Sequence, residues 1–225
     1  MSTETLQVVD FDGNWNTETA QFVESSGLAR VGREYATVGV FGGQSSGKST
    51  LLNLLFGTGF EVMNATIRKQ TTQGIWLSRA KDLPLFILDI EGTDSAARGE
   101  DHMAFERKSS LLAMALCDVV IVNMWEHDVG RQDAANLTLL RTVFEVNLQL
   151  RTDSTRTLLL FVLRDRSQAP LEMLEQTIRG DVSRVWRDVA KVSQTLNILI
   201  YLYMRVCSYL FVARAIRTGR VLTVL

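Results

Sequence analysis

Residues 42–50 have the types and the spacing of a phosphate-binding loop. They read Gly42-Gly43-Gln44-Ser45-Ser46-Gly47-Lys48-Ser49-Thr50 and fit the pattern G-x-x-x-x-G-K-[ST] at every fixed position. In such loops glycines let the backbone approach phosphate oxygens, and the lysine neutralises the β- and γ-phosphates. The run predicts a nucleoside triphosphate site in which Ser49 is a ligand of Mg²⁺. A glycine-rich turn without a ligand is the alternative.

A second motif follows one strand further along the chain. Asp89-Ile90-Glu91-Gly92 ends the apolar run Leu85–Asp89 and has the form D-x-x-G. Asp89 can hold Mg²⁺ through a water, and the Gly92 amide can point at the terminal phosphate. Alone, this pattern mostly marks a turn. Placed one strand beyond a phosphate loop it shares the same sheet edge, and we expect it to bind nucleotide and metal.

The polar connection RKQTTQG, residues 68–74, lies between these motifs. A threonine hydroxyl in a loop that closes over nucleotide can complete the magnesium shell. Thr71 and Thr72 are the two candidates, and a solvated loop threonine is the alternative.

Recognition of the base requires a further group, because a phosphate cradle does not distinguish adenine from guanine. Arg164-Asp165 stands at the end of the apolar run Leu158–Leu163. A carboxylate there can accept both the N1–H and the N2 amino hydrogens of guanine, a paired contact that adenine cannot make. The residues alone are equally consistent with an exposed ion pair at a strand end.

Alternating strand-like and helix-like segments must position these groups. Apolar runs predict strands at 37–41, 85–89, 119–123 and 158–163, and helical periodicity predicts helices at 50–56, 103–116, 136–149 and 171–189. Runs as continuously apolar as VVIVN and LLLFVL are typical of parallel strands covered on both faces. The predicted fold is an α/β P-loop domain with a mainly parallel central sheet flanked by helices. Residues 74–78, GIWLS, are predicted to add an antiparallel edge strand.

Composition narrows the class of protein and of partner. The chain has 225 residues, 46% hydrophobic and 22% charged, which is typical of a globular protein. A formal net charge of −1 gives no electrostatic reason to expect nucleic acid as a partner. The polar start lacks a secretory signal and predicts a cytosolic domain. Leu196–Ala213 has the length of a bilayer span with one charge, Arg205, so both a membrane segment and a buried helix are open.

Several strings resemble, in order and spacing, the root-hair-defective and Sey-type dynamin-like GTPases, the plant, fungal and protist counterparts of atlastin. They are GGQSSGKSTLLNLLFGTGF, RKQTTQGIWL, DIEGTDSAARGEDHMAFE, VVIVNMWEHDVGRQDAAN and FVLRDRS. The resemblance implies a GTPase anchored in the endoplasmic reticulum membrane, with its G domain in the cytosol, that dimerises with GTP and fuses tubules. It also implies that Thr72 is the magnesium threonine and that Arg164-Asp165 replaces the base motif of small GTPases.

The phosphate loop departs from that of atlastin, which carries an arginine at the position of Ser45. Gln44 and Ser45 resemble the pair in dynamin, whose serine helps to hold a monovalent cation. A bound K⁺ or Na⁺, or a basic switch residue such as Arg68, is predicted to supply the missing charge. Gln44, Ser45 and Thr72 would then position phosphate and water, while Lys48 and Mg²⁺ stabilise charge that develops during phosphoryl transfer.

The resemblance stops near Val192. The predicted organisation is a GTP-binding core at residues 1–192, incomplete at its C-terminus, followed by a divergent hydrophobic segment at 193–225. The predicted activity is hydrolysis of GTP to GDP and phosphate. The alternatives are a nucleotide-gated scaffold that binds GTP but hydrolyses little, and an ATP-using enzyme. Predicted partners are GTP, a second copy of the chain and the endoplasmic reticulum membrane; without membrane insertion of 196–213 the location would be cytosolic.

Overall fold

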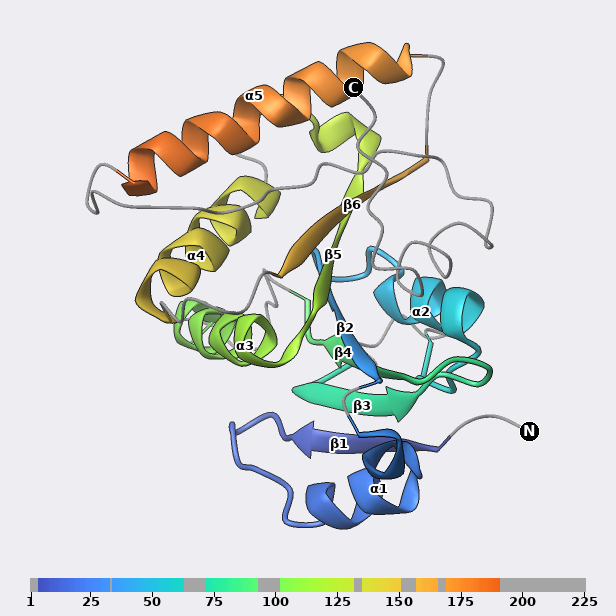
Figure 1. Ribbon diagram of the computed structural model, residues 1–225. Helices are drawn as coiled ribbons and strands as arrows, with labels where there is room; N and C mark the ends of the chain where they lie inside the picture. The colour runs from blue at the N-terminus through green and yellow to red at the C-terminus, as the bar shows by residue number, and fades with distance from the viewer. Residues whose placement is uncertain are drawn as a thin grey trace.

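The computed structural model describes residues 4–32, 34–62, 72–92, 102–131, 135–150, 157–165 and 169–190 (Figure 1). The strands are β1 (Thr5–Val9), β2 (Ala36–Phe41), β3 (Ile75–Arg79), β4 (Leu85–Ile90), β5 (Val119–Trp125) and β6 (Leu158–Arg164). The α-helices are α1 (Thr19–Ser25), α2 (Lys48–Phe56), α3 (His102–Leu116), α4 (Ala135–Leu150) and α5 (Leu171–Ala190), and short 3-10 helices are η1 (Leu28–Val31) and η3 (Glu126–Asp128).

One sheet joins the strands in the order β1-β3-β4-β2-β5-β6. β2 is parallel to both β4 and β5, and β5 is parallel to β6. The predicted α/β fold with a mainly parallel sheet is therefore confirmed. Because parallel strands end at one edge, the segments that follow β2, β4, β5 and β6 meet there. β3 runs the opposite way, so the residues just before it lie at the same edge.

β3 is antiparallel to β4, as predicted, but the prediction that it lies at the sheet edge is wrong. β1 pairs with its outer side, in a register that places Gln7 opposite Trp76. The reason is that β1 is half-buried, with only Val8 below the surface, so it lacks the continuous apolar run that marks a central strand. A side-chain bond strengthens the pairing, because Ser78 Oγ donates to the Glu4 carbonyl at 3.0 Å.

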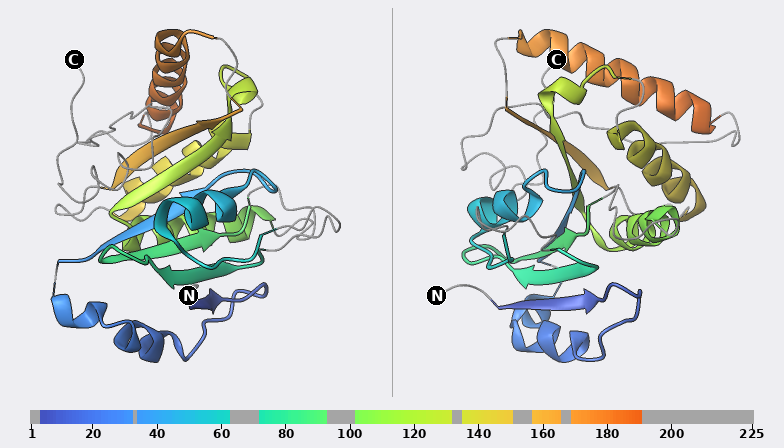
Figure 2. Two further views of the ribbon diagram at one scale, coloured as in Figure 1. Left: turned by 90° about the vertical axis from the view of Figure 1, so that its right-hand side faces the viewer. Right: turned by 180° about the vertical axis from the view of Figure 1, so that it is seen from behind.

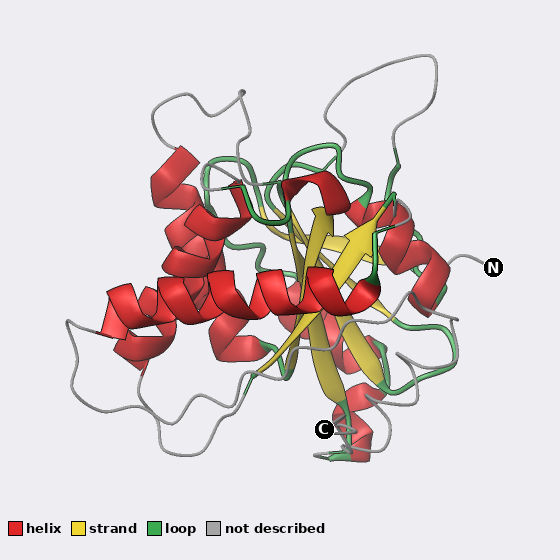
Figure 3. Ribbon diagram, turned by 90° about the horizontal axis from the view of Figure 1, so that it is seen from above, coloured by secondary structure: helices red, strands yellow, loops and turns green. Residues whose placement is uncertain are grey.

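Helices cover both faces of the sheet (Figures 2 and 3). α2 packs through Leu52 and Phe56 on one face, against strand residues such as Ile121. α3, α4 and α5 cover the other face, where α5 buries Leu174, Ile178, Val182, Val185 and Val189 at the predicted helical spacing.

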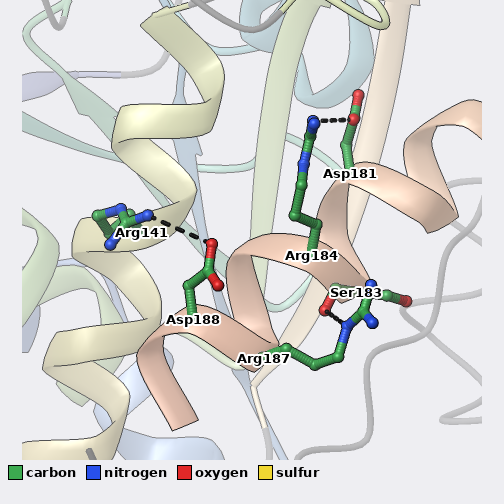
Figure 4. Close-up of polar contacts among 6 residues, drawn as sticks. All are labelled: Arg141, Asp181, Ser183, Arg184, Arg187 and Asp188. Atoms are coloured by element: carbon green, nitrogen blue, oxygen red, sulfur yellow. Dashed lines mark hydrogen bonds and ion pairs between the residues drawn. The ribbon is translucent and has the colours of Figure 1, made fainter. Parts of the chain in front are cut away.

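Surface ion pairs accompany the packing of α4 on α5. Arg141 of α4 lies 3.8 Å from Asp188 of α5, and Arg184 pairs with Asp181 within α5 (Figure 4). Exposed pairs of this kind contribute little to the free energy of unfolding, so the apolar seam holds these helices together. No helix in the described part of the chain is both long and apolar enough to cross a membrane, and Leu196–Ala213 lies outside it.

Candidate nucleotide-binding site

The phosphate loop connects β2 to α2 at the edge where the parallel strands end. α2 begins at Lys48, and Gly47 before it has a φ of 74°, while Ser45 has a φ of 58°. Left-handed residues alternating with right-handed ones curve a backbone into a concave nest of amide groups that attracts anions. A side chain at Gly47 would be strained because of this positive φ, and a Cβ there would also have to displace the guanidinium of Arg164.

A cleft of about 280 Å³ opens beside this loop. Most of the loop lines it, including Gln44, Ser45 and Thr50, together with Thr72, Gly92 and Arg164. The structure thus brings together residues from four separate predicted motifs. Val62 and Trp125 also line the cleft, and the sequence did not single them out.

Lys48 lies under the cleft with only 6% of its surface exposed. Its Nζ donates to the carbonyls of Gly42 at 3.1 Å and Gly43 at 2.9 Å. Together with the backbone amides of the loop, this ammonium group presents positive charge to an anion in the cleft.

Three oxygen-bearing side chains converge next to Lys48. Ser49 Oγ donates to Asp89 Oδ2 at 2.6 Å and lies 3.1 Å from Thr72 Oγ1, which in turn donates to Asp89 Oδ2 at 3.3 Å. Asp89 is 1% exposed, and within the described residues its Oδ1 has no hydrogen-bond partner. Burial raises the pKa of Asp89, while the Ser49 hydroxyl, the Lys48 ammonium and the Thr72 hydroxyl oppose that rise.

This set of groups fits Mg²⁺. Magnesium prefers oxygen ligands, and in an octahedron with ligands at about 2.1 Å neighbouring oxygens lie about 3 Å apart. The spacing between the Ser49 and Thr72 hydroxyls matches such an edge. A buried carboxylate oxygen without a partner among the described residues adds an unused acceptor, Asp89 Oδ1, beside them.

The loop that carries Thr72 is anchored from three sides. The Gln73 carbonyl accepts bonds from Gln7 Nε2 and Trp76 Nε1, both at 2.9 Å. The Gly74 amide donates to the buried carboxylate of Glu91 at 2.6 Å. The strand that the sequence did not predict, β1, thus helps to hold Thr72 at the site. Thr71 and Arg68 lie outside the described residues.

Arg164 lines the same cleft and contacts the phosphate loop. Its guanidinium donates to the Ser46 carbonyl and lies 5.5 Å from the centre of the Trp125 ring, on which His127 stacks. Arg164 is half-buried at the end of β6. Asp165 follows directly, exposed and with a φ of 51°.

Comparison with known proteins places the chain in a family. Residues 41–216 match the family described as "Root hair defective 3 GTP-binding protein (RHD3) GTPase domain". The chain belongs to this family. The match extends beyond residue 192, where the sequence analysis places the end of the GTP-binding core. That domain boundary stays a prediction.

Two curated relatives illustrate the likeness. Protein SEY1 of Laccaria bicolor is 48% identical over 197 residues, covering 84% of this chain and 25% of the relative. Protein ROOT HAIR DEFECTIVE 3 homolog 1 of Oryza sativa is 48% identical over 192 residues, covering 84% of this chain and 22% of the relative. This RHD3-family chain thus spans about a quarter of the length of the curated relatives it matches.

Two solved structures align with about three quarters of the chain, each with a TM-score below 0.5. NFeoB of S. thermophilus bound to GDP·AlF4⁻ aligns with a TM-score of 0.45 at 18% identity, covering 74% of this RHD3-family chain and 66% of NFeoB. Era of Aquifex aeolicus bound to the same ligand aligns with a TM-score of 0.42 at 17% identity, covering 74% and 50%.

Proposed function

We propose that this chain binds GTP together with Mg²⁺ and hydrolyses it to GDP and phosphate. The observation that carries the proposal is the convergence of the Lys48 ammonium with the oxygens of Ser49, Thr72 and Asp89 at one cleft. An ammonium and a divalent-cation site side by side are what a triphosphate requires, since its oxygens carry several negative charges. Membership in a GTPase-domain family supports guanine as the base.

In this proposal each group has a defined task. Lys48 and the amides of the phosphate loop bind the β- and γ-phosphates. Ser49 and Thr72 would hold Mg²⁺ directly and Asp89 through a water, and the ion supplies positive charge to the phosphate oxygens. Gln44 and Ser45 line the same cleft and would position the γ-phosphate and the attacking water. A bound K⁺ or Na⁺, or Arg68, stays the predicted source of further charge.

The wider biology is proposed from the family. Relatives of the chain are Sey-type and root-hair-defective proteins. We therefore propose that this GTP-binding domain acts at the cytosolic face of the endoplasmic reticulum membrane. There, GTP-dependent dimers would tether and fuse membranes.

Base selection tests the nucleotide assignment. Wild-type chain is expected to bind GTP at least about tenfold more tightly than ATP, because Asp165 pairs with two hydrogens of guanine. Asp165→Asn should reverse the preference from GTP to xanthosine triphosphate, whose C2 carbonyl accepts from the new amide. Calorimetric titration with GTP, ATP and xanthosine triphosphate measures both effects.

The control is Asp82→Asn, which removes the same charge from the exposed connection between β3 and β4 and should keep the GTP preference. An unchanged ratio of ATP to GTP affinity in Asp165→Asn would instead favour an ATP-using enzyme. Phosphate release, measured on the same samples, separates a GTPase from a scaffold, which binds GTP but releases little phosphate.

The metal site makes a separate prediction. Ser49→Ala removes one expected ligand, so the Mg²⁺ concentration for half-maximal GTP hydrolysis should rise about 10- to 100-fold. The affinity for GDP measured with EDTA should change little, since no metal then participates. Ser183→Ala is the matched control, because Ser183 lies on α5 and bonds to Arg187 through its backbone carbonyl, which alanine keeps (Figure 4). An unaltered Mg²⁺ requirement in Ser49→Ala would count against this metal site.

A further inference from the structure

Asn123 is a polar residue in an otherwise apolar strand, and its side chain is fully buried. It lies near the carboxyl end of β5, directly behind the phosphate loop. Its Nδ2 donates to the Ser46 carbonyl at 2.9 Å and to Ser46 Oγ at 3.0 Å. Within the described residues its Oδ1 has no partner, so the core satisfies only the donor end of this buried amide.

The carbonyl that Asn123 holds determines where the next amide points. A trans peptide unit is planar, and its C=O and N–H point in opposite directions. The Ser46 carbonyl is drawn inward by Asn123 and by Arg164. The Gly47 N–H of the same peptide unit is therefore directed away from the core, towards the cleft that Gly47 lines.

Asn123 also supports the beginning of the loop. Gly42 lies so close to β5 that a Cβ on it would collide with the carbonyl oxygen of Asn123. One residue of β5 thus contacts the loop at its first position through the backbone and at Ser46 through the side chain. Arg164 of β6 donates to the same Ser46 carbonyl as Asn123. β6, which leads to Asp165, is therefore also bonded to the Ser46–Gly47 peptide.

We propose that Asn123 is a positioning residue that locks the Ser46–Gly47 peptide so that the Gly47 amide faces the nucleotide phosphates. The inference rests on the proposed nucleotide binding. It assigns Asn123 no contact with substrate: the side chain acts through Ser46. A preorganised amide stabilises the bound phosphate in the ground state and in the transition state alike. Loss of the Asn123 side chain should therefore lower the affinity for nucleotide more than it lowers kcat.

Asn123→Leu tests this, because leucine has a similar volume without a donor. The Kd for GDP and the KM for GTP are expected to rise about tenfold, with kcat changed less than about threefold, as for loss of uniform binding. A purely structural role gives the opposite split, since partial unfolding lowers kcat with the folded fraction and leaves KM unchanged. A leucine variant with wild-type Kd and KM overturns the proposal.

Val120→Ala is the matched control. Val120 lies on the same strand, but it packs in the core on the opposite face, against α3–α5. Its loss should lower the melting temperature while the Kd for GDP stays at the wild-type value. Should Asn123→Leu fail to fold, Asn123→Ser provides the same readout, because its hydroxyl is too short to reach the Ser46 carbonyl. Wild-type chain that binds no GDP would refute the proposed function instead.

Discussion

Lys48→Ala is expected to weaken GTP binding by at least about 100-fold and to remove detectable hydrolysis, because truncating a buried, charge-bearing partner costs about 2–5 kcal/mol. Lys48 is 6% exposed, and its ammonium group donates to the Gly42 and Gly43 carbonyls just before the N-terminus of α2. In water an exposed lysine would contribute far less, since solvent screens its charge. Calorimetry with GTP and a single-turnover assay of phosphate release measure the two effects.

Lys108→Ala provides the control for the loss of one positive charge. Lys108 is exposed on α3 and away from the cleft, so its removal should leave GTP affinity at the wild-type value. Wild-type affinity in the Lys48 variant, with the control also unchanged, would remove the basis for a triphosphate at this loop. A loss of affinity in both variants would indicate a long-range electrostatic effect of net charge instead.

The sequence predicted those residues of the candidate site that belong to motifs of residues close together in the chain. Glycine, lysine and serine at fixed spacing specify a turn between strand and helix, so the residue pattern alone predicts a phosphate loop at Gly42–Thr50. Asp89 and Gly92 follow from the same logic, since a parallel sheet brings the ends of β2 and β4 to one edge. The choice of Thr72 over Thr71 as the proposed magnesium ligand required a family resemblance in addition.

The supporting residues could not be predicted in the same way, because their partners are distant in sequence. Asn123 bonds to Ser46 across 77 residues, and Gln7 bonds to Gln73 across 66 residues. One signal for Asn123 was present, namely an amide at the end of the apolar run VVIVN, where a buried polar group requires a partner. No comparable signal marked β1, because a half-buried strand alternates polar and apolar residues as many loops do.

Gly92→Ala tests whether contact between the two motifs is needed for catalysis, and it is the second change with a large expected effect. A Cβ on Gly92 would lie 2.6 Å from Gln44 Cα, 2.7 Å from Gln44 N and 3.0 Å from Lys48 Nζ. Two of these atoms are backbone and cannot rotate away, so either the phosphate loop or the segment after Asp89 must shift. A displacement of about 1 Å at a reacting centre costs about 100-fold in rate, and we expect a loss of that size in single-turnover GTP hydrolysis.

Gly180→Ala separates this close approach from a general effect of adding a methyl group. A Cβ at Gly180, in the middle of α5, meets no atom within 4 Å, so that variant should hydrolyse GTP at the wild-type rate. It should also be more stable, by about 0.5–1 kcal/mol, because alanine is the better helix former. If Gly92→Ala also kept the wild-type rate, the two motifs would tolerate separation, and hydrolysis would not depend on their contact. Loss of GTP hydrolysis in Gly92→Ala, but not in Gly180→Ala, would instead mean that Gly92 must contact the Gln44 backbone for the γ-phosphate to be held correctly.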